Sequence, residues 1–218
     1  MKIGILGGGQ LARMLTLAAL PLGIKVRILS EKREESTDGV AEIFVGSVSN
    51  IEDLLRFSEN LDLITYEFEN FPISALKELE KKVNVFPSVT ALEQGQDRVK
   101  EKTLFEKCKV PTTRWRVAIT AEEVASTAME IGLPVVVKTT RLGYDGKGQW
   151  VINNQTELDS ALPRLNGGPW LVEEKIKFSR EVSIIGARAR NGSKVFYPLV
   201  QNIHREGILR TTIAPAPE

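Results

Sequence analysis

The chain has 218 residues, of which 42% are apolar and 26% charged, and its formal net charge is +1. This composition is typical of a soluble globular protein, and the balanced charge gives no indication of a nucleic-acid or membrane-surface partner. The chain shows no apolar run near the roughly 20 residues that span a bilayer and no signal-peptide pattern. One cysteine, Cys108, and one histidine, His204, exclude a disulfide framework or a Cys/His zinc site within one chain. We therefore expect a cytoplasmic protein.

Strand-like and helix-like segments alternate over the first 90 residues. Short apolar runs indicate strands, and apolar residues spaced by three or four positions indicate helices. The predicted strands are 2–6, 24–29, 41–45, 61–66 and 83–86, and the predicted helices are 10–20, 50–57 and 73–81. Asn50 is the expected N-cap of the second helix. The alternation is typical of a doubly wound parallel sheet, so we predict an α/β domain here.

A glycine-rich motif joins the first strand to the first helix. Residues 7–12, Gly-Gly-Gly-Gln-Leu-Ala, match the dinucleotide fingerprint G-x-G-x-x-A, and Glu31 ends the second strand. Physically, the motif is a helix N-terminus whose amides and dipole can hold an anion. Three interpretations stay open: NAD or FAD, an anionic substrate, or strand–helix packing alone. The dinucleotide interpretation is weakened because residues 110–214 do not resemble the second half of a Rossmann dehydrogenase.

Two carboxylates follow the strand predicted at 61–66. Glu67 and Glu69 lie two positions apart, and on an extended chain they face the same side. Ligands of open α/β sheets bind at the carboxyl ends of the strands. The pair is a candidate for holding sugar hydroxyls or an amine, and the alternative is a solvated acidic loop.

The second half of the chain has a different pattern. Residues 88–109 indicate charged helices that end at Val110-Pro111, and Thr120 with Glu123 has the spacing of a capping box. Further helices are predicted at 120–131 and 156–164, and strands at 134–138, 149–152, 170–174, 181–190, 193–200 and 201–214. Asn191-Gly192 is a strong hairpin signal. We predict an α+β region with an antiparallel sheet.

The predicted strand at 134–138 carries the most informative motif. Its β-branched run ends on Lys138, which places a positive charge at the end of a buried strand. The loop that follows contains three glycines and a second lysine: Gly143, Gly146, Lys147 and Gly148. Glycines let the backbone approach a ligand and expose amide donors, and amides with lysines suit a polyphosphate. The Walker phosphate-loop pattern is absent. The alternative is a long hairpin with surface lysines.

Weaker candidates lie on either side of this motif. The strand edge at 170–176 can present backbone donors and acceptors to a purine, with Glu181 near ribose hydroxyls, but a plain strand with solvated charges explains it equally well. His204 is either structural or functional, and Arg98 with Lys102 form by default a solvated helix face. Cys108 has no predicted role.

Taken in order along the chain, these motifs resemble the ATP-grasp superfamily, and most closely the 5-(carboxyamino)imidazole ribonucleotide synthases of purine biosynthesis. The similar stretches are 7–14, 65–70, 96–102, 134–149, 173–176, 178–183, 202–209 and 214–216. The resemblance implies a Rossmann-like pre-ATP-grasp domain over residues 1–90. It also implies an incomplete ATP-grasp domain over 91–218, with a small lid subdomain at about 112–174 and then the start of a large antiparallel subdomain.

The resemblance further implies an ATP-dependent carbon–nitrogen ligase. The reaction converts ATP, bicarbonate and 5-aminoimidazole ribonucleotide to the N-carboxylated ribonucleotide, ADP and phosphate, through carboxyphosphate. Asp145 would accept a proton from the substrate amine, and Lys147 would steady the carboxyphosphate. The implied ATP-binding residues are Arg98, Lys138, Gly143, Tyr144, Asp145, Gly146, Lys147, Gly148, Gln149, Glu173, Glu174, Lys175, Ile176, Glu181 and His204. The implied ribonucleotide-binding residues are Gln10, Leu11, Glu67 or Glu69, and Tyr144.

Mg²⁺, a homodimer and a functional link to the mutase that follows in the pathway are also implied. The acidic metal ligands of this family are expected beyond residue 218, and none within this chain, so we expect a fragment or a natural short form. One alternative is another ATP-grasp ligase, similar to glycinamide ribonucleotide transformylase or biotin carboxylase. The others are an inactive ATP-binding fragment and a nicotinamide oxidoreductase that rests on residues 7–12 alone.

Overall fold

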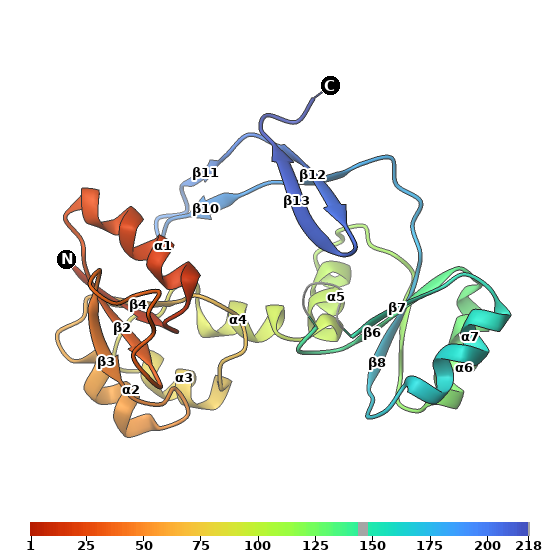
Figure 1. Cartoon of the computed structure of the whole chain (residues 1–218), viewed down its shortest axis with the longest axis horizontal. Helices are drawn as coiled ribbons and strands as arrows, with labels where there is room; N and C mark the ends of the chain where they lie inside the picture. The colour runs from red at the N-terminus through yellow and green to blue at the C-terminus, as the bar shows by residue number, and fades with distance from the viewer. Residues whose placement is uncertain (144–147, 218) are drawn as a thin grey trace. The chain divides into compact units, whose positions relative to one another are not determined.

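The computed structural model describes residues 1–143 and 148–217 (Figure 1). The chain divides into two compact units, residues 1–107 and 108–218, and each is described by itself. The predicted division after residue 90 differs from this one, because the compact first unit also holds the two helices that follow residue 88. Compactness alone does not define a family domain, so the division at 90 stays a prediction.

The first unit contains a parallel four-stranded sheet in the order β3-β2-β1-β4. Its strands are β1 (Lys2–Leu6), β2 (Lys25–Ser30), β3 (Glu42–Val45) and β4 (Leu63–Tyr66). Its helices are α1 (Gln10–Ala19), α2 (Ile51–Ser58), α3 (Ile73–Glu80), α4 (Val89–Gly95) and α5 (Arg98–Lys107), and a short 3-10 helix spans Leu20–Leu22. The predicted parallel α/β architecture is confirmed.

Alternating side chains of the strands contribute to two hydrophobic cores, one on each face of this sheet. Ile5 and Ile28 pack with Ala12 and Ala19 of α1. Their neighbours Leu6 and Leu29 pack on the opposite face with residues of α2, α3 and α4. A strand turns successive side chains to opposite faces, so apolar runs such as Ile5-Leu6 stabilise both layers. This is the doubly wound arrangement that the sequence predicts.

The prediction of a strand at residues 83–86 is wrong. Only a single parallel bridge, between Ile64 and Val85, forms in this segment. The amides of Lys82 and Val83 still donate to the Leu79 carbonyl at the end of α3. Pro87 has no amide hydrogen to continue the ladder. The segment therefore has room for one bridge between a helix end and a proline.

Polar side chains fix the helices of the first unit. The Asn50 side chain accepts from the Glu52 amide at 2.9 Å, which confirms the predicted N-cap. Glu93 on α4 accepts from Lys100 on α5 at 2.8 Å and from Lys77 on α3 at 2.7 Å. Hydrogen bonds from Lys100 and then Lys77 hold the pKa of the Glu93 carboxyl down at about 2. Three helices are thus joined at one partly exposed carboxylate.

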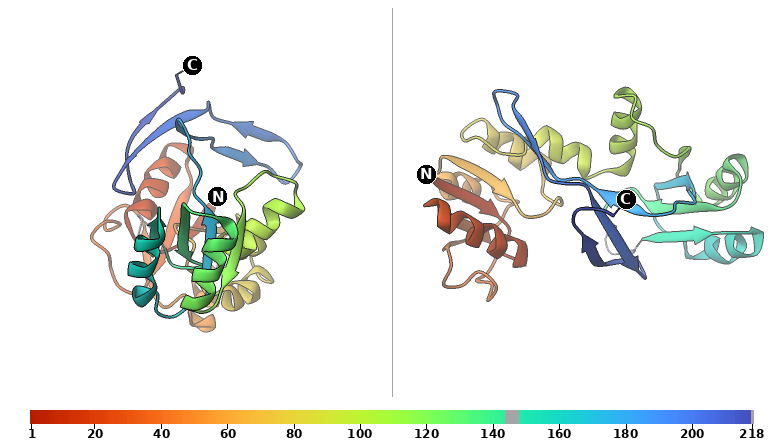
Figure 2. Two further views of the ribbon diagram at one scale, coloured as in Figure 1. Left: turned by 90° about the vertical axis from the view of Figure 1, so that its right-hand side faces the viewer. Right: turned by 90° about the horizontal axis from the view of Figure 1, so that it is seen from above.

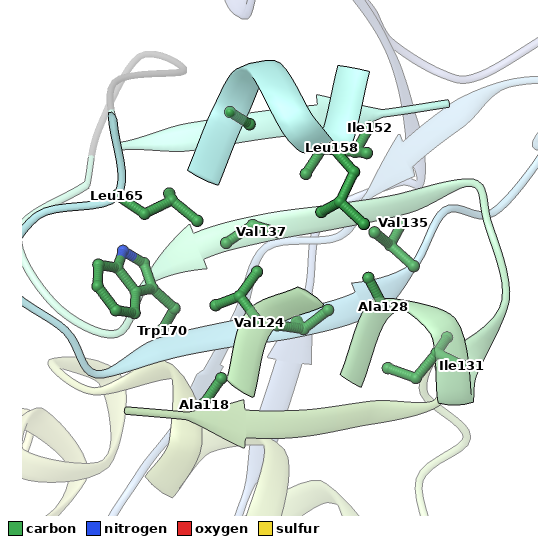
Figure 3. Packing of buried hydrophobic residues seen from close by; sticks show 12 residues of the cluster. Ala118, Val124, Ala128, Ile131, Val135, Val137, Ile152, Leu158, Leu165 and Trp170 are labelled. Atoms are coloured by element: carbon green, nitrogen blue, oxygen red, sulfur yellow. The ribbon is translucent and has the colours of Figure 1, made fainter. Parts of the chain in front are cut away.

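The second unit begins with an antiparallel sheet in the order β5-β8-β6-β7. Its strands are β5 (Trp115–Ala118), β6 (Val135–Thr139), β7 (Gln149–Ile152) and β8 (Trp170–Glu174). Helices α6 (Ala121–Ile131) and α7 (Gln155–Ala161), followed by a 3-10 turn at Leu162–Arg164, lie on one face. Figure 3 shows the core between sheet and helices, in which Val135 and Val137 meet Val124 and Leu158. Val172 belongs to the same core. The predicted N-cap is confirmed, because the Thr120 hydroxyl accepts a hydrogen bond from the Glu123 amide. The Glu123 carboxylate accepts in return from the amide of Ile119, one residue before the N-cap.

The remaining strands are short and open to solvent. They are β9 (Glu181–Ser183), β10 (Gly186–Arg188), β11 (Lys194–Phe196), β12 (Val200–Arg205) and β13 (Ile208–Ile213), and β12 with β13 makes the longest ribbon (Figure 2). The hairpin at Asn191-Gly192 is confirmed between β10 and β11. The long strands predicted at 181–190 and 193–200 are wrong, because both are interrupted.

Burial explains these interruptions. None of the described residues 175–217 is buried, and side chains such as Ile185, Phe196 and Tyr197 are 64–68% exposed. Strands of this length need a packed apolar face to be stable.

Among the helices of the described residues, none is long and apolar enough to cross a membrane.

Candidate functional site

Lys138 lies near the carboxyl end of β6, on the sheet face opposite the core. Val135 and Val137 of the same strand point into the core, so the strand period turns Lys138 the other way. In the β6–β8 pairing, Lys138 lies opposite Leu171 and Val136 opposite Glu173, which makes Lys138 and Glu173 diagonal neighbours. The Lys138 ammonium donates to Oε1 of Glu173. Two residues of the predicted ATP site are therefore joined.

Glu173 is a buried carboxylate, with 5% of the residue exposed. Its second oxygen, Oε2, accepts from the Thr113 hydroxyl at 2.9 Å. The Thr113–Glu173 contact joins residues 60 positions apart, and it follows from the pairing of β5 with β8. Sequence reasoning missed Thr113, since no local pattern around it indicates a ligand or a partner.

The glycine loop begins and ends on described residues. Gly143 is partly buried, and Gly148 has a φ of +69°, in the left-handed region that favours glycine. The Gly148 carbonyl accepts from the Thr139 amide at 2.9 Å, and a Cβ on Gly148 would lie 2.8 Å from Thr139 Oγ1. Gln149 follows on β7, opposite Lys138. The predicted residues Tyr144, Asp145, Gly146 and Lys147 lie outside the described residues.

The residues predicted to line an adenine follow Glu173 directly. Glu174 accepts from Arg114 Nε at 3.0 Å, and this hydrogen bond raises the pKa of the Arg114 guanidinium. The Lys175 ammonium donates to Asn153 Oδ1 at 2.9 Å. The side chains of Glu174 and Lys175 are thus held by neighbours in the protein, while Ile176 is 48% exposed.

Glu181 and His204, both predicted at the nucleotide site, are brought together. Asn202 lies opposite Glu181 in the β9–β12 pairing, which places His204 two positions farther along the same face. His204 Nδ1 lies 2.8 Å from Glu181 Oε2, and both side chains are partly exposed. The pair presents a carboxylate and an imidazole to solvent on one surface.

In the first unit, Glu67 has a partner that the sequence did not predict. Its carboxylate accepts from the amides of Gly9 and Ala12, each at 2.8 Å. Gly7 has a φ of +96°, and a Cβ on Gly7 would lie 2.6 Å from Glu67 Cγ. The glycines therefore make room for a carboxylate of this same chain at the N-terminus of α1, where the sequence predicts free amides.

Glu67 and Glu69 do not share one face of an extended segment, because residues 67–69 bend. The Gln96 side chain donates to the carbonyls of Glu69 and Phe71, and the exposed Glu69 carboxylate lies near the Asn70 amide at 3.4 Å. A pocket of about 750 Å³ lies beside the glycine turn. Glu67 lines it, together with Gly7–Gly9, the end of β2, Glu31, Lys32, Glu34, Val48, Phe68 and Phe71.

Three other predicted residues of the first unit lie on helix surfaces. Gln10 and Leu11 are exposed in the first turn of α1, with Leu11 53% exposed. Arg98 is the first residue of α5, directly after Asp97, whose carboxylate accepts a hydrogen bond from the Val99 amide at 2.9 Å.

Within the described part of the chain, no group of three or more His, Cys, Asp or Glu side chains is placed to hold a metal ion.

Comparison with known families matches both parts of the chain. A model described as the ribonucleotide synthetase preATP-grasp domain matches residues 1–96, and the ATP-grasp domain model matches residues 103–218. The chain belongs to the ATP-grasp family. This membership, with Glu67 filling the anion position at α1, disfavours the nicotinamide interpretation of residues 7–12.

Relatives match nearly the whole chain. The chain is 37% identical to a Pseudomonas aeruginosa protein named N5-carboxyaminoimidazole ribonucleotide synthase, over 98% of the chain and 59% of that protein. The Thermus thermophilus synthetase structure of the same name is 43% identical with a TM-score of 0.89, over 99% of the chain and 58% of that structure. An Aspergillus clavatus synthase, solved in complex with ADP and 5-aminoimidazole ribonucleotide, is 26% identical with a TM-score of 0.87, over 99% and 57%.

The chain thus spans about three-fifths of the length of these relatives. The predicted resemblance to ATP-grasp enzymes named for the carboxylation of an aminoimidazole ribonucleotide is confirmed.

Proposed function

We propose that this chain provides the nucleotide-binding part of an ATP-dependent carbon–nitrogen ligase that carboxylates 5-aminoimidazole ribonucleotide. The products are the N-carboxylated ribonucleotide, ADP and phosphate, as part of purine biosynthesis. The observation that carries the proposal is Lys138, held near the end of β6 beside the glycine loop, within the region that matches the ATP-grasp domain. The names of the relatives supply the substrate.

The ATP-binding roles follow the predicted residues. Lys138 and Arg98 would donate to phosphate oxygens, and residues 143–149 would cover the phosphates. Backbone groups of residues 173–176 would contact the adenine. Glu181 would accept from ribose hydroxyls, and the hydrogen bond between Glu181 and His204 supports a shared role at the nucleotide. Lysine and backbone amides are suitable donors for phosphate oxygens.

The proposed chemistry runs through carboxyphosphate. A bicarbonate oxygen attacks the γ-phosphorus of ATP, and ADP leaves. The carbon–oxygen bond of carboxyphosphate then breaks to give carbon dioxide and phosphate, and the amine of the ribonucleotide attacks the carbon dioxide. Asp145 would take the amine proton, and Lys147 would steady the phosphorylated intermediate. Water would hydrolyse that intermediate, so residues 143–149 would also serve as a lid.

The ribonucleotide would bind at Gln10, Leu11, Glu67 or Glu69, and Tyr144. Of the first four, Glu67 lines the pocket beside the glycine turn. The amides of the α1 N-terminus are already bonded to Glu67, so an anionic group could use them only by displacing that carboxylate. Glu67 is better suited to accept hydrogen bonds from hydroxyls or an amine.

Mg²⁺ is proposed as the metal that accompanies ATP. The described residues offer no cluster that fits it, so its ligands are proposed in sequence that the longer relatives carry, and no step is derived through the metal. We also propose a cytoplasmic homodimer whose product passes to the mutase that follows in the pathway. These three proposals rest on the resemblance to the synthases.

A second candidate is an ATP-binding chain without turnover. It is favoured by the exposed apolar side chains of residues 181–213. Another ATP-grasp ligase activity, similar to glycinamide ribonucleotide transformylase or biotin carboxylase, is the third.

Release of ADP from ATP, magnesium and bicarbonate distinguishes the three candidates. The main proposal predicts that 5-aminoimidazole ribonucleotide stimulates ADP release when the chain is joined to the further sequence that its longer relatives carry, and that Lys138→Met loses this stimulation. Stimulation by glycinamide ribonucleotide with formate, or by biotin, would replace the proposed substrate. ATP binding without stimulation by any of them would favour the chain without turnover.

A further inference from the structure

The side chain of Glu173 is bonded inside the protein, although its position in the sequence assigns it to the adenine. The carboxylate is 7% exposed, and both of its oxygens have partners: Oε1 accepts from the Lys138 ammonium and Oε2 from the Thr113 hydroxyl. The Lys138 side chain is 27% exposed. The carboxylate is therefore the buried member of the pair, and the lysine reaches toward solvent.

A buried carboxylate is stable only when it is paired and hydrogen-bonded. Thr113, two residues before β5, donates to one oxygen of Glu173, and Glu173 itself lies on β8, which is paired on both sides, with β5 and with β6. Glu173 is thus anchored on two sides, whereas the Lys138 ammonium lies at the end of a flexible four-carbon side chain. A flexible ammonium bonded to an anchored carboxylate loses most of its freedom, and ordering a lysine side chain is otherwise costly when a ligand binds.

The ammonium keeps donors for a ligand. A lysine has three N–H donors, and the bond to Glu173 Oε1 takes one of them. The other two remain near the carboxyl end of β6, which pairs with the start of β7 at Gln149 and where the Thr139 amide donates to the Gly148 carbonyl. The pair can therefore bind a phosphate without breaking its own contact.

We propose that Glu173 is a positioning residue that orders the Lys138 ammonium for a polyphosphate, and that its side chain makes no contact with the adenine. This inference rests on the proposed ATP-binding function. It differs from a competing role, in which Glu173 neutralises Lys138 and must be displaced by the nucleotide. The two roles predict opposite changes in ATP affinity when the charge of Glu173 is removed.

Equilibrium dialysis with labelled ATP and, separately, labelled adenosine tests the proposal in the full chain. Glu173→Gln keeps the size of the side chain and removes its charge. We expect its ATP dissociation constant to rise by about tenfold and its adenosine dissociation constant to stay unchanged. Lys138→Met should show the same selectivity. The double variant should bind ATP no more weakly than Lys138→Met alone, because the effect of Glu173 acts through the lysine.

Two further variants control the experiment. Thr113→Val removes the hydroxyl that anchors Glu173 and should weaken ATP binding by a smaller factor, again without changing adenosine binding. It also provides the test should Glu173→Gln fail to fold. Glu130→Gln removes a carboxylate of an exposed pair with Arg116 in the same unit, and should change neither affinity.

Four results would overturn the proposal. Equal losses for ATP and adenosine in Glu173→Gln would place the side chain at the adenine. Tighter ATP binding would make Glu173 a competitor of the phosphates. Unchanged ATP binding would remove any role for the pair. Absence of ATP binding by the unmodified chain would reject the proposed function together with this inference, which separates that failure from the other three.

Discussion

Replacing Glu67 by alanine removes the carboxylate that closes the N-terminus of α1. The amide of the N-cap residue Gly9 and the amide of Ala12 in the first turn then lose acceptors that lie at 2.8 Å. Loss of a helix-capping side chain costs about 1 kcal/mol, in a range of roughly 0.5–2. A charged acceptor bonded to two amides and aligned with the helix dipole contributes more, so we expect a local cost of about 2–3 kcal/mol.

Hydrogen exchange measures this cost where it arises. A chain with two compact units need not unfold in one step, so a global midpoint would not isolate α1. Local opening that becomes easier by about 2–3 kcal/mol accelerates exchange by roughly 30- to 150-fold. The expected acceleration lies at the Gly9 and Ala12 amides and through α1. Glu67→Gln, which keeps one carbonyl oxygen, should show a smaller acceleration.

Glu69→Ala is the matched control, because its carboxylate is exposed and bonded only locally, at 3.4 Å to Asn70, among the described contacts. It should leave the exchange of α1 unchanged. Unchanged exchange of Gly9 and Ala12 in Glu67→Ala would refute the reasoning. Equal acceleration in both variants would also refute it, since it would show a general effect of charge rather than capping.

Three further predictions concern the loop, the nucleotide surface and the helix bundle of the first unit. Gly148→Ala should weaken ATP binding measured by dialysis, because of its positive φ and its close approach to Thr139, whereas Gly167→Ala, at φ +79° with nothing within 4 Å, should not. Glu181→Gln should weaken binding of ATP but not of tripolyphosphate, which has no ribose; equal losses would contradict a ribose contact. Hydrogen bonds, first from Lys100, lower the pKa of the Glu93 carboxyl to about 2. The ionised carboxylate therefore stabilises the folded chain fully above the ordinary pKa of 4.5, and this stabilisation is lost as the pH falls through about 2. Glu93→Gln should therefore be less stable than the unmodified chain in urea unfolding at pH 6, with the difference disappearing below pH 2; a difference that persists there would contradict the ion-pair explanation.

Local pattern predicted the architecture of the sheet-and-helix parts well. The apolar runs of β1 and β2 and the capping residues Asn50 and Thr120 act over a few positions, and their effects are confirmed. The wrong predictions concern segments whose strand propensity is not supported by their tertiary surroundings. Residues 83–86 have strand composition but lie between a helix end and Pro87, and residues 181–200 lack a packed face.

Partners at the candidate site could not be predicted from local pattern. Glu67 and Gly9 are 58 positions apart, and Thr113 and Glu173 are 60 positions apart. Each contact depends on which strands become neighbours, β4 with β1 in the first case and β8 with β5 in the second. The family resemblance predicts that Lys138, Glu173, Glu181 and His204 belong to a nucleotide site, whereas the two pairs that they form appear only in the folded chain.

The fate of bicarbonate oxygen tests the proposed chemistry most directly. With bicarbonate labelled by ¹⁸O at all three positions, together with ATP, magnesium and 5-aminoimidazole ribonucleotide, one bicarbonate oxygen attacks the γ-phosphorus and stays with the phosphate when carboxyphosphate breaks. Mass spectrometry of the released phosphate should show one ¹⁸O per molecule, formed in step with ADP. Unlabelled phosphate accompanying ADP would mean that water attacks ATP, and would contradict carboxylation through carboxyphosphate.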